Sequence, residues 1–445
     1  MAKQSGAVGK RSLIEVGAGG EGVNNFLPKA QLGVKYVADA VNFDIDDAGL
    51  LRSRKGFMQV YAGNIHSLFS HKGISYFREA DTLKSIQKIG PYYVAATLRS
   101  GIPTGRQRVW YVPVNDCIYY TDGVITGCIQ NGTSRQWGII PPPLPSIRNA
   151  QIGSLKDGTY LVALTYSRSD GYESGTVGVV RFDGAGGFYV DYVASSDPNI
   201  TNINVYVSTR GADTLCLAYS TSNISGTFLY DGTGMLLSMP INTMFEYPPL
   251  AGQLIEYFYG YMLVARENVL FYSEPYRYES FRYESNFMVF DDRITLLCSV
   301  KDGLFVGTET GIHFLQGTDL PKITKYSVAG YGAIYGTQER GKPFADVVYC
   351  SSRRGQCKLS TGGTLENLTD GVVYFDTGDY GAGYYREQGG IIQYVATIAQ
   401  PDEEGWDEYE QRIDIGIALP SLGMIDNVAD VGLPIFQVSA TMESS

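Results

Sequence analysis

A unit of strand, turn and strand recurs along this chain and limits the folds open to it. In each unit an apolar strand, a turn of Asp, Asn or Lys with Gly, and an aromatic-rich strand follow one another. The turns lie at Gly73, Asp116, Gly260, Gly303 and Gly355. Residues 73 and 116 are about 43 apart, as are 260 and 303, and 303 and 355 are about 52 apart. Four-stranded propeller blades repeat every 40 to 50 residues or so.

The spacing therefore predicts an all-β chain with a β-propeller of about six blades, the last one begun by a strand over 391–398. The alternative is a generic β-sandwich built from ordinary hairpins. Composition supports the all-β class, because Gly (53) and Tyr (34) are abundant among 445 residues and favour short strands with tight turns. An α/β enzyme would need repeated amphipathic helical stretches, which the sequence lacks.

One interval is too long for a single blade. Asp116 and Gly260 are about 144 residues apart, which leaves about 100 residues beyond one period, the size of a small sandwich domain. Prolines bound this excess, at Pro141–Pro145 and in the segment 247–249. We expect an arm over 1–20, a first propeller part over 21–145, an inserted immunoglobulin- or fibronectin-III-like sandwich over 146–246, and a second propeller part over 247–445. The proline-rich segments are expected to be stiff linkers.

The net charge, the cysteines and the apolar runs indicate which partners and which compartment the chain is suited to. The formal net charge of −11 lacks the basic surface of a protein that grips nucleic acid, and an acidic wall would keep DNA phosphates from sticking as they slide. The six cysteines (117, 128, 216, 298, 350 and 357) form no Cys-x-x-Cys pair and are expected to be reduced and mostly buried. With no apolar run near 18 residues, we expect a soluble protein without a membrane segment, made in a cytoplasm.

The segment from Gly22 to Phe57 contains an alternating strand that turns back on itself. Asp47, Ala48 and Gly49 are predicted to form a three-residue hairpin loop. The predicted cross-strand pairs are Ile45 with Leu51, Asp44 with Arg52, and Asn42 with Arg54. One register then satisfies both packing and charge.

Two short motifs match the residue pattern of a ligand-binding motif but lack the surroundings or the ligands that binding requires. Gly17, Gly19 and Gly22 fit a dinucleotide fingerprint with Asp39 downstream, but no βαβ unit surrounds them, so we predict a turn and no cofactor. The acids at Asp44, Asp46 and Asp47 begin like a calcium loop. Its fifth position is Ala48 and its twelfth is Lys55, so we predict turn residues and no metal.

Catalytic arrangements are sought in the histidines and paired carboxylates. His66, His71 and His313 form no metal-binding array, and the first two are predicted to be strand or turn residues beside a hairpin. Glycan hydrolysis uses two neighbouring carboxylates, and Glu279 and Glu284 are a candidate pair of this kind. An arginine two residues before each, Arg277 and Arg282, favours ion pairing at a surface or interface instead. We therefore predict no catalytic, cofactor-binding or metal-binding residues and no enzyme activity.

Several segments of the chain resemble one protein family. They are residues 22–25, 50–57, 137–143, 270–276, 302–308 and 311–315, which read Gly-Val-Asn-Asn, Leu-Leu-Arg-Ser-Arg-Lys-Gly-Phe, Trp-Gly-Ile-Ile-Pro-Pro-Pro, Leu-Phe-Tyr-Ser-Glu-Pro-Tyr, Asp-Gly-Leu-Phe-Val-Gly-Thr and Gly-Ile-His-Phe-Leu. With these segments the chain resembles the tail nozzle proteins of short-tailed bacteriophages, also called tail tubular protein B or packaged-DNA stabilisation protein.

The resemblance implies a structural virion protein without cofactors. It implies a homohexameric ring that extends the DNA channel below the portal and adaptor, retains the packaged genome and guides its ejection. Its partners would be copies of itself, the adaptor and portal, and fibre, spike or needle proteins, with DNA passing non-specifically. Its place would be the phage tail, after assembly in the host cytoplasm. The alternative from another class is a tail propeller that binds or cuts host glycans through aromatic loops.

Overall fold

The structure is a computed structural model, and its strands are almost all antiparallel. It describes residues 22–33, 35–39, 43–45, 51–53, 59–103, 108–232, 239–341, 346–373, 378–388, 391–399 and 436–441. Within these ranges the helical elements are three short 3-10 turns, η1 (Lys29–Gln31), η2 (Leu320–Lys322) and η3 (Thr361–Gly363). The predicted arm over 1–20 lies outside the described residues. The all-β class is confirmed.

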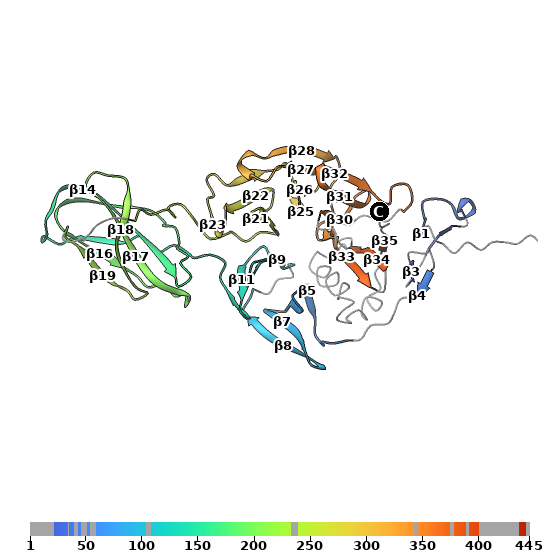
Figure 1. The fold of residues 1–445 in the computed structure, drawn as a ribbon, viewed down its shortest axis with the longest axis horizontal. Helices are drawn as coiled ribbons and strands as arrows, with labels where there is room; N and C mark the ends of the chain where they lie inside the picture. The colour runs from blue at the N-terminus through green and yellow to red at the C-terminus, as the bar shows by residue number, and fades with distance from the viewer. Residues whose placement is uncertain are drawn as a thin grey trace, which may run out of the picture. The chain divides into compact units, whose positions relative to one another are not determined.

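The chain divides into two compact units, residues 63–332 and residues 1–62 with 333–445. Four meander sheets of the first unit follow one another along the chain (Figure 1). The first two comprise β5 (Ile65–His71), β6 (Ile74–Glu79), β7 (Thr82–Ile89) and β8 (Tyr92–Arg99), then β9 (Trp110–Val114), β10 (Cys117–Thr121), β11 (Thr126–Gln130) and β12 (Thr133–Arg135). The next two comprise β20 (Leu254–Phe258), β21 (Tyr261–Arg266), β22 (Val269–Glu274), β23 (Arg277–Phe281) and β24 (Phe287–Val289), then β25 (Ile294–Val300), β26 (Gly303–Thr308), β27 (Ile312–Gln316) and β28 (Thr324–Ala329).

The second unit has two further meander sheets. They comprise β29 (Glu339–Arg340), β30 (Val347–Ser352), β31 (Gly355–Ser360) and β32 (Thr364–Asn367), then β33 (Tyr380–Gln388), β34 (Ile391–Ala399) and β35 (Phe436–Thr441). This unit also holds the parallel pair β1 (Gly22–Val23) and β2 (Tyr36–Val37). The strand expected over 391–398 is thus the middle strand of a sheet.

Contacts between sheets follow the order of propeller blades. In the first unit, the first strand of each sheet contacts the first strand of the next: β5 lies against β9, β9 against β20, and β20 against β25. Side chains of neighbouring sheets share apolar cores; Leu83 of β7, for example, belongs to the same cluster as Ile118 and Tyr120 of β10. Consecutive antiparallel sheets of four or five strands, joined through their first strands, are the architecture of a β-propeller. The predicted propeller class is confirmed.

The turns that revealed the repeat are hairpin turns in the structure. Gly73, Asp116, Gly260 and Gly303 each lie between, or at the edge of, the first and second strands of their sheets. Gly355 instead begins β31, the third strand of its sheet, because β29 has only two residues and gave no sequence signal. The longer interval of about 52 residues therefore reflects a different turn and not a longer blade.

A two-sheet sandwich interrupts the meanders. Its strands are β13 (Ser146–Asn149), β14 (Leu155–Arg168), β15 (Val180–Gly186), β16 (Phe188–Tyr192), β17 (Ile200–Ser208), β18 (Leu215–Ser222) and β19 (Gly226–Tyr230). The sheets have the orders β13-β16-β19 and β15-β14-β17-β18, and one apolar core joins Val162 and Val205 of one sheet to Phe188 and Val190 of the other. In an immunoglobulin domain the first, second, fifth and fourth strands share a sheet. The observed order differs, so the immunoglobulin-like type is not confirmed.

The hairpin predicted near the start of the chain is present as β3 (Phe43–Ile45) and β4 (Leu51–Ser53). Its register pairs Ile45 with Leu51 and Asp44 with Arg52, as predicted. The predicted pair of Asn42 and Arg54 lies outside the described residues, as do the loop residues 46–50.

Candidate functional site

The candidate site lies at β23, where both connections between the sandwich and the meander sheets return. The first connection runs from the end of β12 to the start of β13, and the second runs from β19 to the start of β20. The first connection contacts β23 through Trp137 and Gly138, and the second contacts it through Tyr247. The site is therefore a junction inside the first compact unit.

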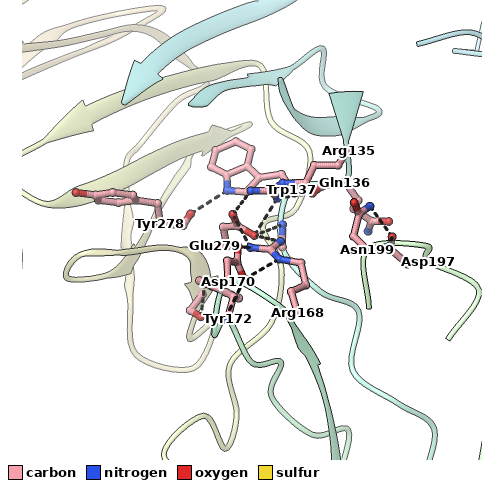
Figure 2. Close-up of polar contacts among 12 residues, drawn as sticks. Arg135, Gln136, Trp137, Arg168, Asp170, Tyr172, Asp197, Asn199, Tyr278 and Glu279 are labelled. Atoms are coloured by element: carbon pink, nitrogen blue, oxygen red, sulfur yellow. Dashed lines mark hydrogen bonds and ion pairs between the residues drawn. The ribbon is translucent and has the colours of Figure 1, made fainter. Parts of the chain in front are cut away.

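Glu279 of β23 is the centre of the junction (Figure 2). Its side chain is 5% exposed and accepts hydrogen bonds from two arginines. Arg135 Nη2 donates to Oε1 at 2.7 Å and its Nη1 to Oε2 at 3.2 Å, while Arg168 Nη1 donates to Oε2 at 2.7 Å and its Nη2 to Oε1 at 3.2 Å. The backbone N–H of Gly138 adds a fifth bond, at 3.1 Å to Oε2. We call Glu279, Arg135, Arg168 and Gly138 the Glu279 cluster.

The Glu279 cluster joins three parts of the chain that are far apart in the sequence. Arg135 at the end of β12 and Gly138 just after it form the first part, Arg168 at the end of β14 of the sandwich is the second, and Glu279 of β23 is the third. Arg168 also pairs with Asp170, with Nη2 2.9 Å from Oδ2, and its guanidinium lies 4.9 Å from the ring centre of Tyr172. Because a carboxylate offers about four lone-pair positions, these donors occupy its accepting capacity. The cluster can fix sandwich and meander sheets together.

The pKa values of the two arginines in the Glu279 cluster reflect both their burial and their carboxylate partners. Burial acts to lower the pKa of Arg135, but its hydrogen bonds to Glu279 outweigh this and the pKa is raised. The pKa of Arg168 is raised by the same balance. Burial acts to raise the pKa of Asp170, yet hydrogen bonds from Arg168 leave it lowered. Two cations and two carboxylates thus neutralise each other within the junction.

The first connection is also fixed by an aromatic anchor. Trp137 is fully buried, and its Nε1–H donates to the carbonyl oxygen of Tyr278 at 2.8 Å. Its ring meets Phe281 edge-on at 6.2 Å. Gly138 next to it has φ +84°, and a Cβ there would lie 2.7 Å from the Cβ of Pro248 in the second connection. Only glycine suits this backbone and this close approach.

The second connection is fixed by its own charge cluster. Glu246 is 1% exposed and pairs with two arginines, Arg277 Nη1 donating to Oε1 at 2.8 Å and Arg282 Nη2 at 3.3 Å. We call these three residues the Glu246 cluster. Tyr247 and Phe281 exchange two backbone hydrogen bonds of 2.9 Å, like neighbouring strands. The proline-rich connections are therefore held along β23.

The structure changes the partners predicted for the paired glutamates. Glu279 is in a buried ion cluster, but its arginines are Arg135 and Arg168, whereas Arg277 and Arg282 pair with Glu246. Glu284 is exposed and lies outside both clusters. Sequence reasoning missed Arg135 and Arg168, which lie 144 and 111 residues from Glu279, and Glu246, which lies 31 and 36 residues from its arginines. Partners this far apart leave no local spacing signal.

The other residues considered from the sequence lie elsewhere. His66 and His71 belong to β5, as predicted for strand residues, and His66 Nδ1 bonds with the hydroxyl of Ser67 at 2.8 Å. Burial lowers the pKa of His313, whose ring lies 5.7 Å from Phe290. The six cysteines are free, and four of them are buried.

Residues 17–21 of the glycine motif and the remaining acids of the calcium-like loop, Asp46 and Asp47, lie outside the described residues. In the part of the chain that is described, no three His, Cys, Asp or Glu side chains gather as a metal site. The described helical turns include none with the length and apolar character to cross a bilayer.

These features define a β-propeller protein whose sandwich is fixed to a blade-type sheet through buried charges. No family model matches the sequence, and no curated protein matches it either. Among solved structures it is similar to BBS1N in complex with ARL6DN, at 10% identity over 77% of this chain and 91% of that one, with a TM-score of 0.32. It is also similar to the Pan2 WD40 domain of Neurospora crassa, at 9% identity over 72% of this chain and 85% of that one, with a TM-score of 0.30. The WD40 propeller of Doa1 gives 9% identity, 77% and 90% coverage, and a TM-score of 0.27. Scores this low say nothing of function, and the fold assignment rests on the strand order above.

Proposed function

We propose that this chain is a structural virion protein, the tail nozzle subunit of a short-tailed bacteriophage. Six copies would form a ring that extends the DNA channel below the portal and adaptor, retains the packaged genome and guides its ejection. The observation that carries the proposal is the junction at β23. It fixes an added domain to a propeller-type sheet through two charge clusters centred on the buried glutamates Glu279 and Glu246, and such fixed domains suit a structural protein.

The resemblance and the junction involve the same residues. Two of the segments that resemble nozzle proteins, 137–143 and 270–276, supply the first connection and the strand that leads into β23. Trp137, which begins the first of them, is the aromatic anchor. Two of the six family-like segments thus contribute to the junction, which supports a role in architecture.

The charge of the chain suits a conduit. With a formal net charge of −11, its surface offers DNA phosphates little attraction, so DNA would slide without being held.

Negative-stain imaging of the purified protein and of the virion tests the proposal. We expect six-fold rings with a continuous axial opening, placed below the portal in particles. Single propellers at the tail periphery that bind host glycans would contradict the nozzle and support a receptor-binding or glycan-cutting propeller instead.

A further inference from the structure

The outer hairpin of the first meander sheet exposes apolar side chains. It consists of β7 and β8, and their register places Ile89 opposite Tyr92 and Gln87 opposite Val94. Ile89 is 58% exposed, Tyr92 is 74% exposed and Val94 is 49% exposed. Because facing residues and residues two apart share a face, these three form one apolar patch at the hairpin tip.

The other face of the hairpin is also open. Residues 95 to 97 of β8 are exposed on both faces of the ribbon. Within the described residues, no strand pairs with the outer edge of β8, which is the last strand of its sheet. An apolar ribbon with an open edge is a surface that natural proteins cover with a partner.

The third meander sheet shows what a covered outer strand looks like. Its strand β23 holds the two connections to the sandwich, and Glu279, Ser280 and Phe281 are buried there. Strand β8 is more apolar at its start, with Tyr-Tyr-Val-Ala-Ala, and yet it is more exposed. Among the described residues of this unit, the outer strand of the first sheet therefore has no cover like that of the third sheet.

Charge indicates the kind of partner. Residues 82–99 contain no Asp or Glu and carry Lys84, Lys88 and Arg99. Lys84 pairs with Glu79 of β6 and Arg99 donates to Tyr120 of β10, which leaves Lys88 as the exposed cation of the hairpin. Lys88 is exposed on the opposite face of the ribbon from the patch, where it pairs across the strands with Tyr93 and its Nζ lies 5.9 Å from the ring centre of Tyr93. The chain as a whole has a formal net charge of −11, so another copy offers this basic hairpin a surface of opposite sign.

We propose that the β7–β8 hairpin is the contact by which one copy of this chain binds the next. The neighbouring copy contacts both exposed faces of the hairpin tip. The patch of Ile89, Tyr92 and Val94 packs against it on one face, and Lys88 on the other face meets one of its acidic side chains. The inference rests on the proposed ring and names the surface that closes it.

The test compares two triple variants by light scattering at matched concentrations. One carries Ile89→Ser, Tyr92→Ser and Val94→Thr. The control carries Ile152→Ser, Val193→Ser and Ile224→Ser, which alter three apolar residues of the sandwich that are 53%, 56% and 68% exposed. Thermal melting checks that both variants fold.

We expect wild type and control to remain rings, and the hairpin variant to dissociate with an affinity loss of about 100-fold or more. A hairpin variant that stays a ring overturns the inference and leaves the nozzle proposal intact. A variant that stays a ring but fails to enter particles indicates a different protein as partner and also overturns it.

Hydrogen exchange of the hairpin amides shows whether the hairpin is covered by another copy, by its own chain or by nothing. We expect protection of residues 87–96 in the ring and its loss in the variant. Protection in a wild-type monomer would mean that the chain covers its own hairpin, which contradicts the inference. A wild-type monomer with unprotected amides contradicts both the ring and the contact.

Discussion

Two carboxylates in the first unit bind arginine through paired hydrogen bonds but lie in opposite surroundings. Glu279 at the junction is 5% exposed and has two arginines. Asp191 on the sandwich has one, with Arg148 Nε donating to Oδ2 at 2.8 Å and Nη2 to Oδ1 at 2.9 Å, and side-chain exposures of 57% and 33%. The hydrogen-bond geometry is nearly the same at both sites. The difference in burial should therefore decide how much stability is lost when each carboxylate is removed.

The difference has a physical basis. At the surface, water screens the charges of Arg148 and Asp191 and would solvate either one if the other were removed. At the junction, Arg135 and Arg168 have lost most of their water and depend on Glu279. The buried cluster is therefore costly to break, whatever its net contribution when intact.

Replacement of Glu279 by alanine should have the largest effect. The change leaves the buried guanidinium of Arg135 without its carboxylate and leaves Arg168 with Asp170 alone, and we expect a loss of roughly 3–5 kcal/mol in the free energy of unfolding. Urea denaturation followed by tryptophan fluorescence measures it, since Trp137 lies beside the cluster. The matched control is the exposed Glu284→Ala, expected within about 0.5 kcal/mol of wild type. Equal effects of the two variants would contradict the comparison.

Deletion of residues 146–246 should have the next largest effect. The deletion removes Arg168 and Glu246, so Glu279 keeps only Arg135, and Arg277 and Arg282 lose their shared partner. We expect the remainder to fold with a loss of roughly 1–3 kcal/mol, because its meander sheets have cores of their own. Circular dichroism melting measures it. Global unfolding would show that the sandwich is required for the fold.

Substitution of Gly138 by alanine tests the close approach of the two connections. We expect a loss of more than about 1 kcal/mol, since the residue has φ +84° and its new Cβ would meet Pro248. Gly132→Ala is the control, because Gly132 has φ +75° with nothing within 4 Å of the added Cβ. The difference between their denaturation midpoints reports the clash alone. Equal midpoints would mean that the connections do not touch.

The surface pair should give the smallest effect, and one that depends on pH. Hydrogen bonds from Arg148 and then Thr227 lower the pKa of Asp191 to about 2, against about 3.9 in the unfolded chain. Its contribution to stability is therefore present above about pH 4 and is lost as the pH falls toward 2. We expect Asp191→Asn to be slightly less stable than wild type at pH 7, with the gap closing by pH 2. A gap that widens on acidification would contradict this sign.

The sequence predicts local structure here and leaves distant pairings undetermined. Turn residues such as Gly73 and Gly260 revealed the hairpins, and alternation with charge revealed the pairing of Asp44 with Arg52, because both signals lie within a few residues. The order of the sandwich strands was not predictable in this way, since alternating side chains indicate a strand but not its neighbour. The partners of Glu279 lie 144 and 111 positions away, at Arg135 and Arg168. Only the folded chain brings them together.

The rigid junction at β23 is tested most directly by a distance measurement within one chain. Nitroxide labels on genetically encoded residues at position 224 of the sandwich and position 326 of β28 leave the native cysteines untouched, and dilution with unlabelled chain removes distances between copies. Pulsed electron resonance should give one narrow distance distribution in wild type, which broadens in Glu279→Ala. A broad distribution in wild type would contradict the account, because the sandwich would then move freely on its connections.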